Sequence, residues 1–168
     1  LYPDALHISR SLRKALRRDN YRVTLDSAFP DVMRACAESR PGQTGTWITA
    51  DMQAAYTELH RLGYAHSVEI RMDGELVGGL YGVALGKVFF GESMFSRRTN
   101  GSKIALAWLM RQLLAWDFRL LDCQVASPHL ARLGMSTLPR DAFLARLERD
   151  ARAPDRTGRW QLDVTPVF

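Results

Sequence analysis

Apolar and polar positions follow two different periods along this chain, and each change of period marks an expected element. Between residues 66 and 91, apolar side chains alternate with polar or small ones, which is typical of β-strands. Asp73-Gly74 interrupts the alternation with the dipeptide most typical of a two-residue hairpin, and Leu85-Gly86 marks a second reversal. The pattern therefore predicts an antiparallel meander of three strands, over 66–72, 75–84 and 87–90.

A period near 3.6 predicts helices on both sides of this meander. The expected helices cover residues 8–18, 28–37, 50–62, 100–115, 128–133 and 139–150. Thr49 and Gly63 are typical boundary residues of the third helix, and Pro139 is expected at the first position of the last. Further strands are expected at 21–25, 120–125 and 161–164, and loops at 38–45 and 151–159.

This order of elements predicts an α+β protein with a mostly antiparallel central sheet flanked by helices. A meander followed by a helix and a further strand is similar to the GNAT acyltransferase fold, in which two central strands splay apart. We expect one GNAT-like catalytic domain over 1–168. Its parts are a basic helical lead-in (1–22), a core (46–150) and a C-terminal tail (151–168).

Composition excludes several classes of protein. The chain is 46% hydrophobic and 24% charged, which is typical of a globular protein. No apolar run approaches the roughly 20 residues of a membrane span, and no signal peptide opens the sequence. Cys36 and Cys123 are expected as free thiols, and the histidines lack zinc-site spacing. We therefore expect a cytoplasmic protein without membrane contact, metal or cofactor.

Positive charge is concentrated near the start of the chain. The net charge is +5, and residues 1–22 carry six cationic against two acidic side chains. Five of these cations lie on the predicted helix 8–18: Arg10, Arg13, Lys14, Arg17 and Arg18. Two interpretations fit, the solvated face of a docked helix or a contact with nucleic-acid phosphates.

Polar residues in apolar surroundings mark the candidate catalytic groups. Asp122 and Gln124 are two residues apart on a predicted strand, so both side chains are expected on one face. Glu92 follows the third meander strand, which can neighbour the Asp122 strand, so the three groups are expected in one cleft. Two carboxylates there suit a cationic substrate group such as an amine. The alternatives are a strand-end cap for Asp122 and Gln124, and a surface Glu92 near Arg97 or Arg98.

Other residues suggest a substrate pocket beside these groups. Phe89, Met94, Phe95 and Leu109 are expected to line an apolar pocket, with ordinary core positions as the alternative. Gly78, Gly79 and Gly82 predict a bulge, a close approach by a ligand, or tight packing of a helix on the sheet.

The polar loop 96–103 lies where GNAT acetyltransferases bind the pyrophosphate of coenzyme A. Arg98 and Gly101 match the pattern of that loop, whereas Lys103 stands where the pattern has Gly or Ala. The loop therefore fits coenzyme A only in part.

Longer strings of residues resemble a known family. They are HISRSLRK, GTWIT, YTELHRLGYAHSVE, GELVGGLYGVALG, FFGESMFSR, SKIALAWL, LLDCQ, HLARLG and LPRDAFLARL, collinear from about Leu6 to Leu147. Together they resemble the bacterial leucyl/phenylalanyl-tRNA–protein transferases, and GESMFSR with DCQ is the most specific combination.

The resemblance implies transfer of leucine or phenylalanine from aminoacyl-tRNA to the N-terminal Arg or Lys of acceptor proteins, which marks them for degradation. It implies catalytic roles for Asp122, Gln124 and Glu92. It also implies substrate contacts at Phe89, Met94, Phe95, Ser96 and Leu109, tRNA contacts on the basic helix, no cofactor, and a monomer.

Family members usually carry a further N-terminal segment and a tryptophan pair that holds the terminal adenosine of the tRNA, and both are expected to be lacking here. Two alternatives stay open. The first is a GNAT-type acetyltransferase that uses acetyl-coenzyme A, and the second is a non-catalytic tRNA-binding module.

Overall fold

Five strands form one mixed sheet in the computed structural model, which describes residues 1–38 and 46–165. The strands are β1 (Arg22–Leu25), β2 (Ala65–Met72), β3 (Glu75–Leu85), β4 (Val88–Ser96) and β5 (Leu120–Asp122), and they lie in this order across the sheet. Neighbours from β1 to β4 are antiparallel, whereas β5 is parallel to β4. The predicted meander and the α+β class are confirmed.

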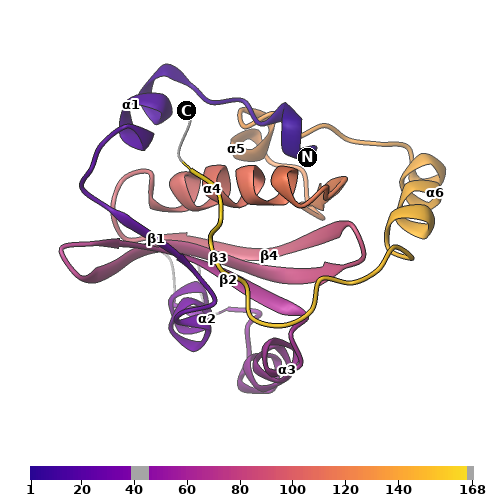
Figure 1. Cartoon of the computed structure of the whole chain (residues 1–168), viewed down its shortest axis with the longest axis horizontal. Helices are drawn as coiled ribbons and strands as arrows, with labels where there is room; N and C mark the ends of the chain where they lie inside the picture. Colours follow the sequence, from indigo (N-terminus) through magenta and orange to yellow (C-terminus); the bar gives the residue numbers. More distant parts are fainter. Residues whose placement is uncertain (39–45, 166–168) are drawn as a thin grey trace.

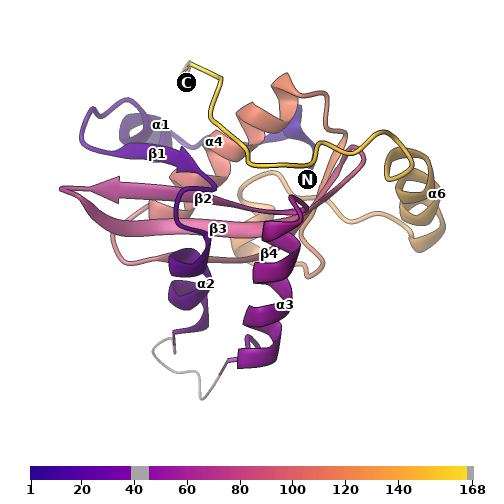
Figure 2. The same ribbon diagram turned by 60° about the horizontal axis from the view of Figure 1, so that its bottom comes forward.

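Helices cover both faces of this sheet. They are the 3-10 turn η1 (Pro3–Ala5) and the α-helices α1 (Arg10–Leu16), α2 (Phe29–Ala37), α3 (Ala50–Arg61), α4 (Gly101–Ala115), α5 (Pro128–Ala131) and α6 (Arg140–Asp150). Figure 1 shows α4, α1 and α5 on one face, and α2 and α3 on the other; in the turned view of Figure 2, α1 and α4 again lie opposite α2 and α3. Each face has its own hydrophobic core, here called the α4-side core and the α2-side core.

Local signals explain where these elements begin and end. Asp73 and Gly74 both have positive φ, 53° and 83°, as a tight hairpin of this twist requires. The Thr49 side chain accepts a hydrogen bond from the Met52 N–H and so caps α3, and Gly63 follows the helix with φ 82°. These predicted boundaries are confirmed.

The glycines of β3 allow close packing and an irregular strand. A Cβ atom added at Gly78 would lie 2.5 Å from the Gly101 backbone, so α4 contacts the sheet through two glycines. The register between β3 and β4 shifts between Tyr81 and Gly82. The sequence left a bulge and tight helix packing as alternative interpretations of these glycines, and the structure contains both.

Several predicted boundaries are wrong. β4 runs to Ser96 instead of residue 90, because β3 continues to pair with it as far as Gly78. β5 ends at Asp122 instead of 125, because Gln124 takes a left-handed φ of 60° that no strand contains. Pro139 is the N-cap of α6 and not its first residue. Of the predicted loop 38–45, all but Glu38 lies outside the described residues.

The predicted strand 161–164 does not form, and side chains accept hydrogen bonds from the backbone in and next to this segment. The Trp160 N–H donates to Asp26 at 2.7 Å, and the Asp163 N–H donates to the Gln112 side chain at 3.0 Å. This segment belongs to the C-terminal tail, which runs from α6 across the molecule (Figure 1). Trp160 fixes the tail in the α4-side core, with 2% of its surface exposed.

Candidate active site

The parallel strands β4 and β5 pair over only three residues each, and a cavity lies beyond this short pairing. Val88, Phe89 and Phe90 pair with Leu120, Leu121 and Asp122, after which β4 continues to Ser96 without β5. The cavity has a volume of about 570 Å³ and includes residues of β4 and of the segment after β5 in its wall. Its size falls within the range of small-molecule sites.

A β-bulge places Glu92 in this wall. Tyr81 pairs with Ser93, and Gly82 pairs with Gly91, so Glu92 is an extra residue on β4 without a direct partner. Bulges are frequent beside active sites because they redirect a side chain out of the regular alternation.

One part of the cavity wall is apolar. The structure brings together three of the predicted pocket residues, Phe89, Met94 and Leu109. Four further leucines line the same cavity: Leu80, Leu106, Leu121 and Leu130.

Two other predicted pocket residues lie elsewhere. Phe95 is buried in the α2-side core, because the bulge reverses the facing of the strand between Phe89 and Phe95. The Ser96 hydroxyl accepts the Ser102 N–H at 2.7 Å and so caps the start of α4. Neither residue belongs to the described cavity wall, which corrects their predicted substrate contacts.

Gln124 links the other two predicted catalytic residues, by a route that differs from the prediction. The Gln124 Nε2 donates to Glu92 Oε1 at 3.3 Å, and the Gln124 backbone N–H donates to Asp122 Oδ1 at 2.9 Å. The chain therefore turns at Gln124 instead of continuing a strand, and the expectation that Asp122 and Gln124 share a strand face is wrong. A second cavity of about 470 Å³ lies against β5, and Asp122 and Gln124 line it. The triad thus lies between two cavities.

Two tyrosines that the sequence analysis did not select surround Glu92. The Tyr56 hydroxyl of α3 lies near Glu92, and burial together with this carboxylate raises the pKa of Tyr56. Tyr81 of β3 is fully buried, and burial, with Cys36, Tyr56 and Glu92 nearby, raises the pKa of Tyr81. Both phenols are therefore neutral near neutral pH. No sequence pattern marks them, because only the fold brings α3 and β3 to Glu92.

Two further side chains in the wall were missed. Trp47 lines the cavity with 52% of its surface exposed, so an indole is present at the site although the tryptophan pair was expected to be lacking. In the sequence, this tryptophan stands beside an apolar isoleucine, and no pattern there predicts that its side chain is exposed. His129 of α5 also lines the cavity; partial burial, with the charges of Lys103 and Arg132, lowers its pKa.

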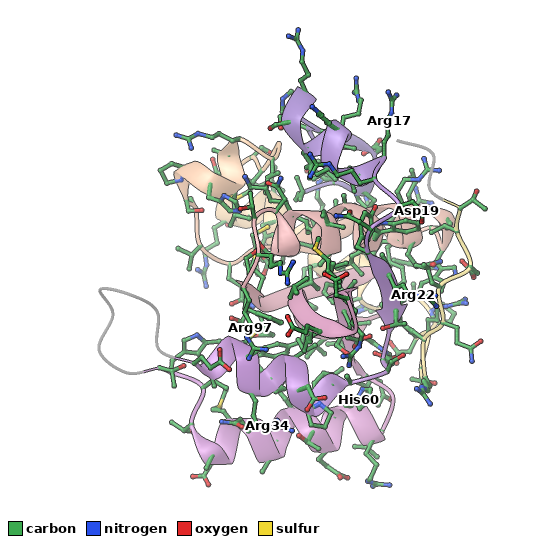
Figure 3. All side chains as sticks on the ribbon, turned by 90° about the vertical axis from the view of Figure 1, so that its left-hand side faces the viewer. Arg17, Asp19, Arg22, Arg34, His60 and Arg97 are labelled. Carbon is green, nitrogen blue, oxygen red and sulfur yellow. The ribbon has the colours of Figure 1, made fainter. Side chains whose placement is uncertain are left out.

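The basic helix α1 is docked by its apolar side. Leu12 and Leu16 are buried against the α4-side core, whereas the five predicted cations are exposed. Ser9 caps the helix by accepting the Leu12 N–H. Figure 3 shows Arg17 pointing outward from α1, at the opposite end of the view from Arg34 and His60 on the α2 and α3 layer. The cationic face of this helix is thus exposed to solvent and accessible to an anionic partner.

The backbone at the start of α4 is already hydrogen-bonded. The Gly101 N–H donates to the Arg98 carbonyl at 3.0 Å, in addition to the bond from Ser102 to Ser96. The Arg98 guanidinium lies 3.6 Å from both Asp73 and Glu75. Arg98 and the N–H groups of Gly101 and Ser102 thus already have partners within the chain, which weakens the match to a pyrophosphate site.

Within residues 1–38 and 46–165, no group of three or more His, Cys, Asp or Glu side chains is arranged to hold a metal ion. Both cysteines are free thiols, and burial raises the pKa of Cys123. No helix in the described part of the chain is long and apolar enough to cross a bilayer.

Comparisons with solved structures find acetyltransferases. The chain is similar to an aminoglycoside N-acetyltransferase in complex with CoA, with a TM-score of 0.47 and 14% identity over 90% of this chain and 98% of that one. A GCN5-related N-acetyltransferase from Kribbella flavida gives a TM-score of 0.46 and 15% identity over 80% of this chain and 51% of that one.

Sequence comparisons are far more specific. A protein from Chromobacterium violaceum named leucyl/phenylalanyl-tRNA–protein transferase is 53% identical over 95% of this chain and 69% of its own length. A protein of the same name from Cellvibrio japonicus is 59% identical over 85% of this chain and 61% of its own length. The family model described as leucyl/phenylalanyl-tRNA protein transferase matches residues 1–148. This chain therefore belongs to the leucyl/phenylalanyl-tRNA protein transferase family.

Proposed function

We propose that this chain transfers leucine or phenylalanine from aminoacyl-tRNA to the N-terminal Arg or Lys of acceptor proteins, and so marks them for degradation. The observation that carries the proposal is the hydrogen-bonded pair of Gln124 and Glu92 beside an apolar cavity of about 570 Å³. The reaction needs an apolar pocket for the amino acid attached to tRNA, and next to it a carboxylate for the cationic acceptor.

The donor fits the apolar part of the cavity and the basic surface. The wall formed by Phe89, Met94 and Leu109 suits a leucine or phenylalanine side chain, and methionine adapts to either shape. Trp47 is placed to stack on a nucleic-acid base, a contact worth about 1–3 kcal/mol. The exposed cations of α1 suit the phosphates of the tRNA.

The reaction is an exchange of an ester for an amide. The acceptor α-amine, whose ordinary pKa is about 8, must be neutral before it attacks the ester carbonyl carbon. A C–N bond forms, the carbonyl oxygen becomes negative in the tetrahedral intermediate, and the C–O bond to the tRNA ribose then breaks. The ribose oxygen leaves as a hydroxyl with the proton that the amine releases. Because the ester is already activated, the step consumes no nucleotide.

Asp122, Gln124 and Glu92 have separate roles in this proposal. One N–H of the Gln124 amide is bonded to Glu92, and the other is available to donate to the developing oxyanion. Asp122 holds the Gln124 backbone in its left-handed conformation, which costs about 1 kcal/mol or more for a residue other than glycine. Glu92 supplies the negative charge that attracts the acceptor.

We also propose that the chain acts as one catalytic domain and as a monomer. The cytoplasm is its proposed compartment, because charged tRNA is present there.

The test is mass spectrometry of a peptide with N-terminal arginine after incubation with this chain and leucyl-tRNA. The expected result is a gain of one leucine residue, and its loss in Gln124→Ala. Acetyl-coenzyme A is offered in a parallel reaction. A gain of an acetyl group instead of leucine would support the acetyltransferase alternative, and tRNA binding without any transfer would support the binding module.

A further inference from the structure

A fully buried hydroxyl in the cavity wall has no hydrogen-bond partner. Tyr81 is 0% exposed, and among the described residues nothing bonds to its Oη atom. Its ring is held edge-on by Phe29, with centroids 5.9 Å apart, and by Tyr56, with centroids 5.3 Å apart. A buried polar group without a partner destabilises a fold, so such a group requires an explanation.

Tyr81 belongs to the part of the cavity wall that also contains Glu92. Its surroundings include Tyr56 and Cys36. The preceding residue, Leu80, belongs to the α4-side core, whereas Tyr81 belongs to the α2-side core. Alternation along β3 therefore places Leu80 and Tyr81 on opposite faces of the sheet, with Leu80 on the side of α4 and Tyr81 on the side of α2 and α3, although both line the cavity.

The other buried side-chain atom without a partner in the described residues is Nε2 of His66. The His66 ring stacks on Trp160 with centroids 3.6 Å apart, and it is not part of the cavity wall. Tyr81 therefore differs from His66, because Tyr81 belongs to the wall of the cavity that contains Glu92.

We propose that the Tyr81 hydroxyl binds the acceptor, by accepting a hydrogen bond from the cationic side chain of its N-terminal Arg or Lys beside the Glu92 carboxylate. This inference rests on the proposed function. A guanidinium has five N–H donors and an ammonium has three, so one carboxylate leaves donors unpaired. A neutral phenol oxygen accepts one of them without adding a second negative charge. The hydroxyl is thus unpaired only while the acceptor is absent.

The test compares Tyr81→Phe with the unmodified chain. We expect Tyr81→Phe to raise the Kd for a short peptide with N-terminal arginine about tenfold in calorimetry, as for one hydrogen bond to a charged group. In the leucyl-tRNA assay the peptide KM is expected to rise by a similar factor, whereas the leucyl-tRNA KM stays unchanged. The melting temperature is expected to stay the same or rise, because the variant removes an unpaired buried hydroxyl.

Tyr21→Phe is the matched control. The Tyr21 hydroxyl donates to the Leu16 carbonyl at 2.8 Å and accepts the Trp108 Nε1–H at 3.2 Å, away from the cavity. Its removal is expected to lower the melting temperature and leave peptide binding unchanged.

The outcomes separate this inference from the proposed function. Unaltered peptide affinity in Tyr81→Phe, a clear loss of its thermal stability, or no affinity of the unmodified chain for the peptide would each overturn the role of Tyr81. Tenfold weaker peptide binding in a chain that transfers no leucine would support the role of Tyr81 while the proposed function fails.

Discussion

Replacing Trp160 by alanine is expected to be among the most destabilising single changes in the chain. The Trp160 ring stacks on His66 with centroids 3.6 Å apart and packs edge-on against Trp116 and Phe118. Its Nε1–H donates to the Arg156 carbonyl at 3.0 Å. The substitution would therefore remove an aromatic cluster and leave the tail without its buried anchor.

The size of the effect follows from burial. A buried tryptophan removes about 200 Å² from water, which corresponds to about 5 kcal/mol as an upper estimate. Measured substitutions of this kind cost about 3–5 kcal/mol, so we expect a loss of about 4 kcal/mol in the free energy of unfolding. The unfolding entropy of 168 residues is about 0.35 kcal/mol/K, so the melting temperature should fall by about 11 °C.

Calorimetric melting of Trp160→Ala beside Trp47→Ala checks this reasoning. Trp47 is 52% exposed at the cavity, so its removal should lower the melting temperature by no more than about 3 °C while it weakens tRNA binding. Equal shifts for the two variants, or a shift below about 3 °C for Trp160→Ala, would refute the view that Trp160 anchors the tail.

Four further predictions follow from the site and the core. Asp122→Ala is expected to abolish leucine transfer in the mass-spectrometric assay and leave tRNA binding intact; turnover like that of the unmodified chain would contradict the assignment. Alanine substitution of the cations in and next to α1 should lower the slope of log affinity against log salt by about one per lost phosphate contact, and an unchanged slope would place the tRNA elsewhere. The cations to be changed are Arg13 and Lys14 of α1, and Arg17 and Arg18, which follow it. Burial raises the pKa of Glu69, so its contribution to stability is present below the unfolded pKa of about 4.3 and is lost as the pH rises through the raised folded value. Glu69→Gln should therefore flatten the pH dependence of denaturation midpoints, and a curve parallel to that of the unmodified chain would be inconsistent with this cause. Gly78→Ala would place a Cβ atom 2.5 Å from the Gly101 backbone, so urea denaturation should show a loss of about 1–3 kcal/mol or more.

Elements with a local cause could be predicted from the sequence. The hairpin at Asp73-Gly74 and the end of α3 at Gly63 depend on single residues that tolerate positive φ, and both form as expected. The meander depends on alternation, which is also a local property. The sequence also predicted that β4 and β5 are neighbours, as they are, but the bulge that directs Glu92 and the turn at Gln124 were not predicted.

Features that depend on contacts distant in sequence could not be predicted in this way. Tyr56 and Tyr81 meet Glu92 only because α3 packs across the sheet. Trp160 reaches Asp26, 134 positions earlier in the chain, and its surroundings in the sequence are polar. The segment 161–164 alternates as a strand does, but within the described residues it joins no sheet, and the Gln112 side chain binds its backbone instead.

The bulge at Glu92 links the features that could be predicted from the sequence with those that could not. In a regular strand, Phe89 and Met94 would face opposite sides, because five positions separate them and side chains alternate with a period of two. Both nevertheless pack in the α4-side core, while Phe95 lies in the α2-side core. One extra residue between Gly91 and Ser93 resolves this conflict, and that residue is Glu92. The same insertion that brings Phe89 and Met94 to one side therefore places a carboxylate at the edge of the apolar pocket, an arrangement that suits the proposed transfer from an apolar donor to a cationic acceptor.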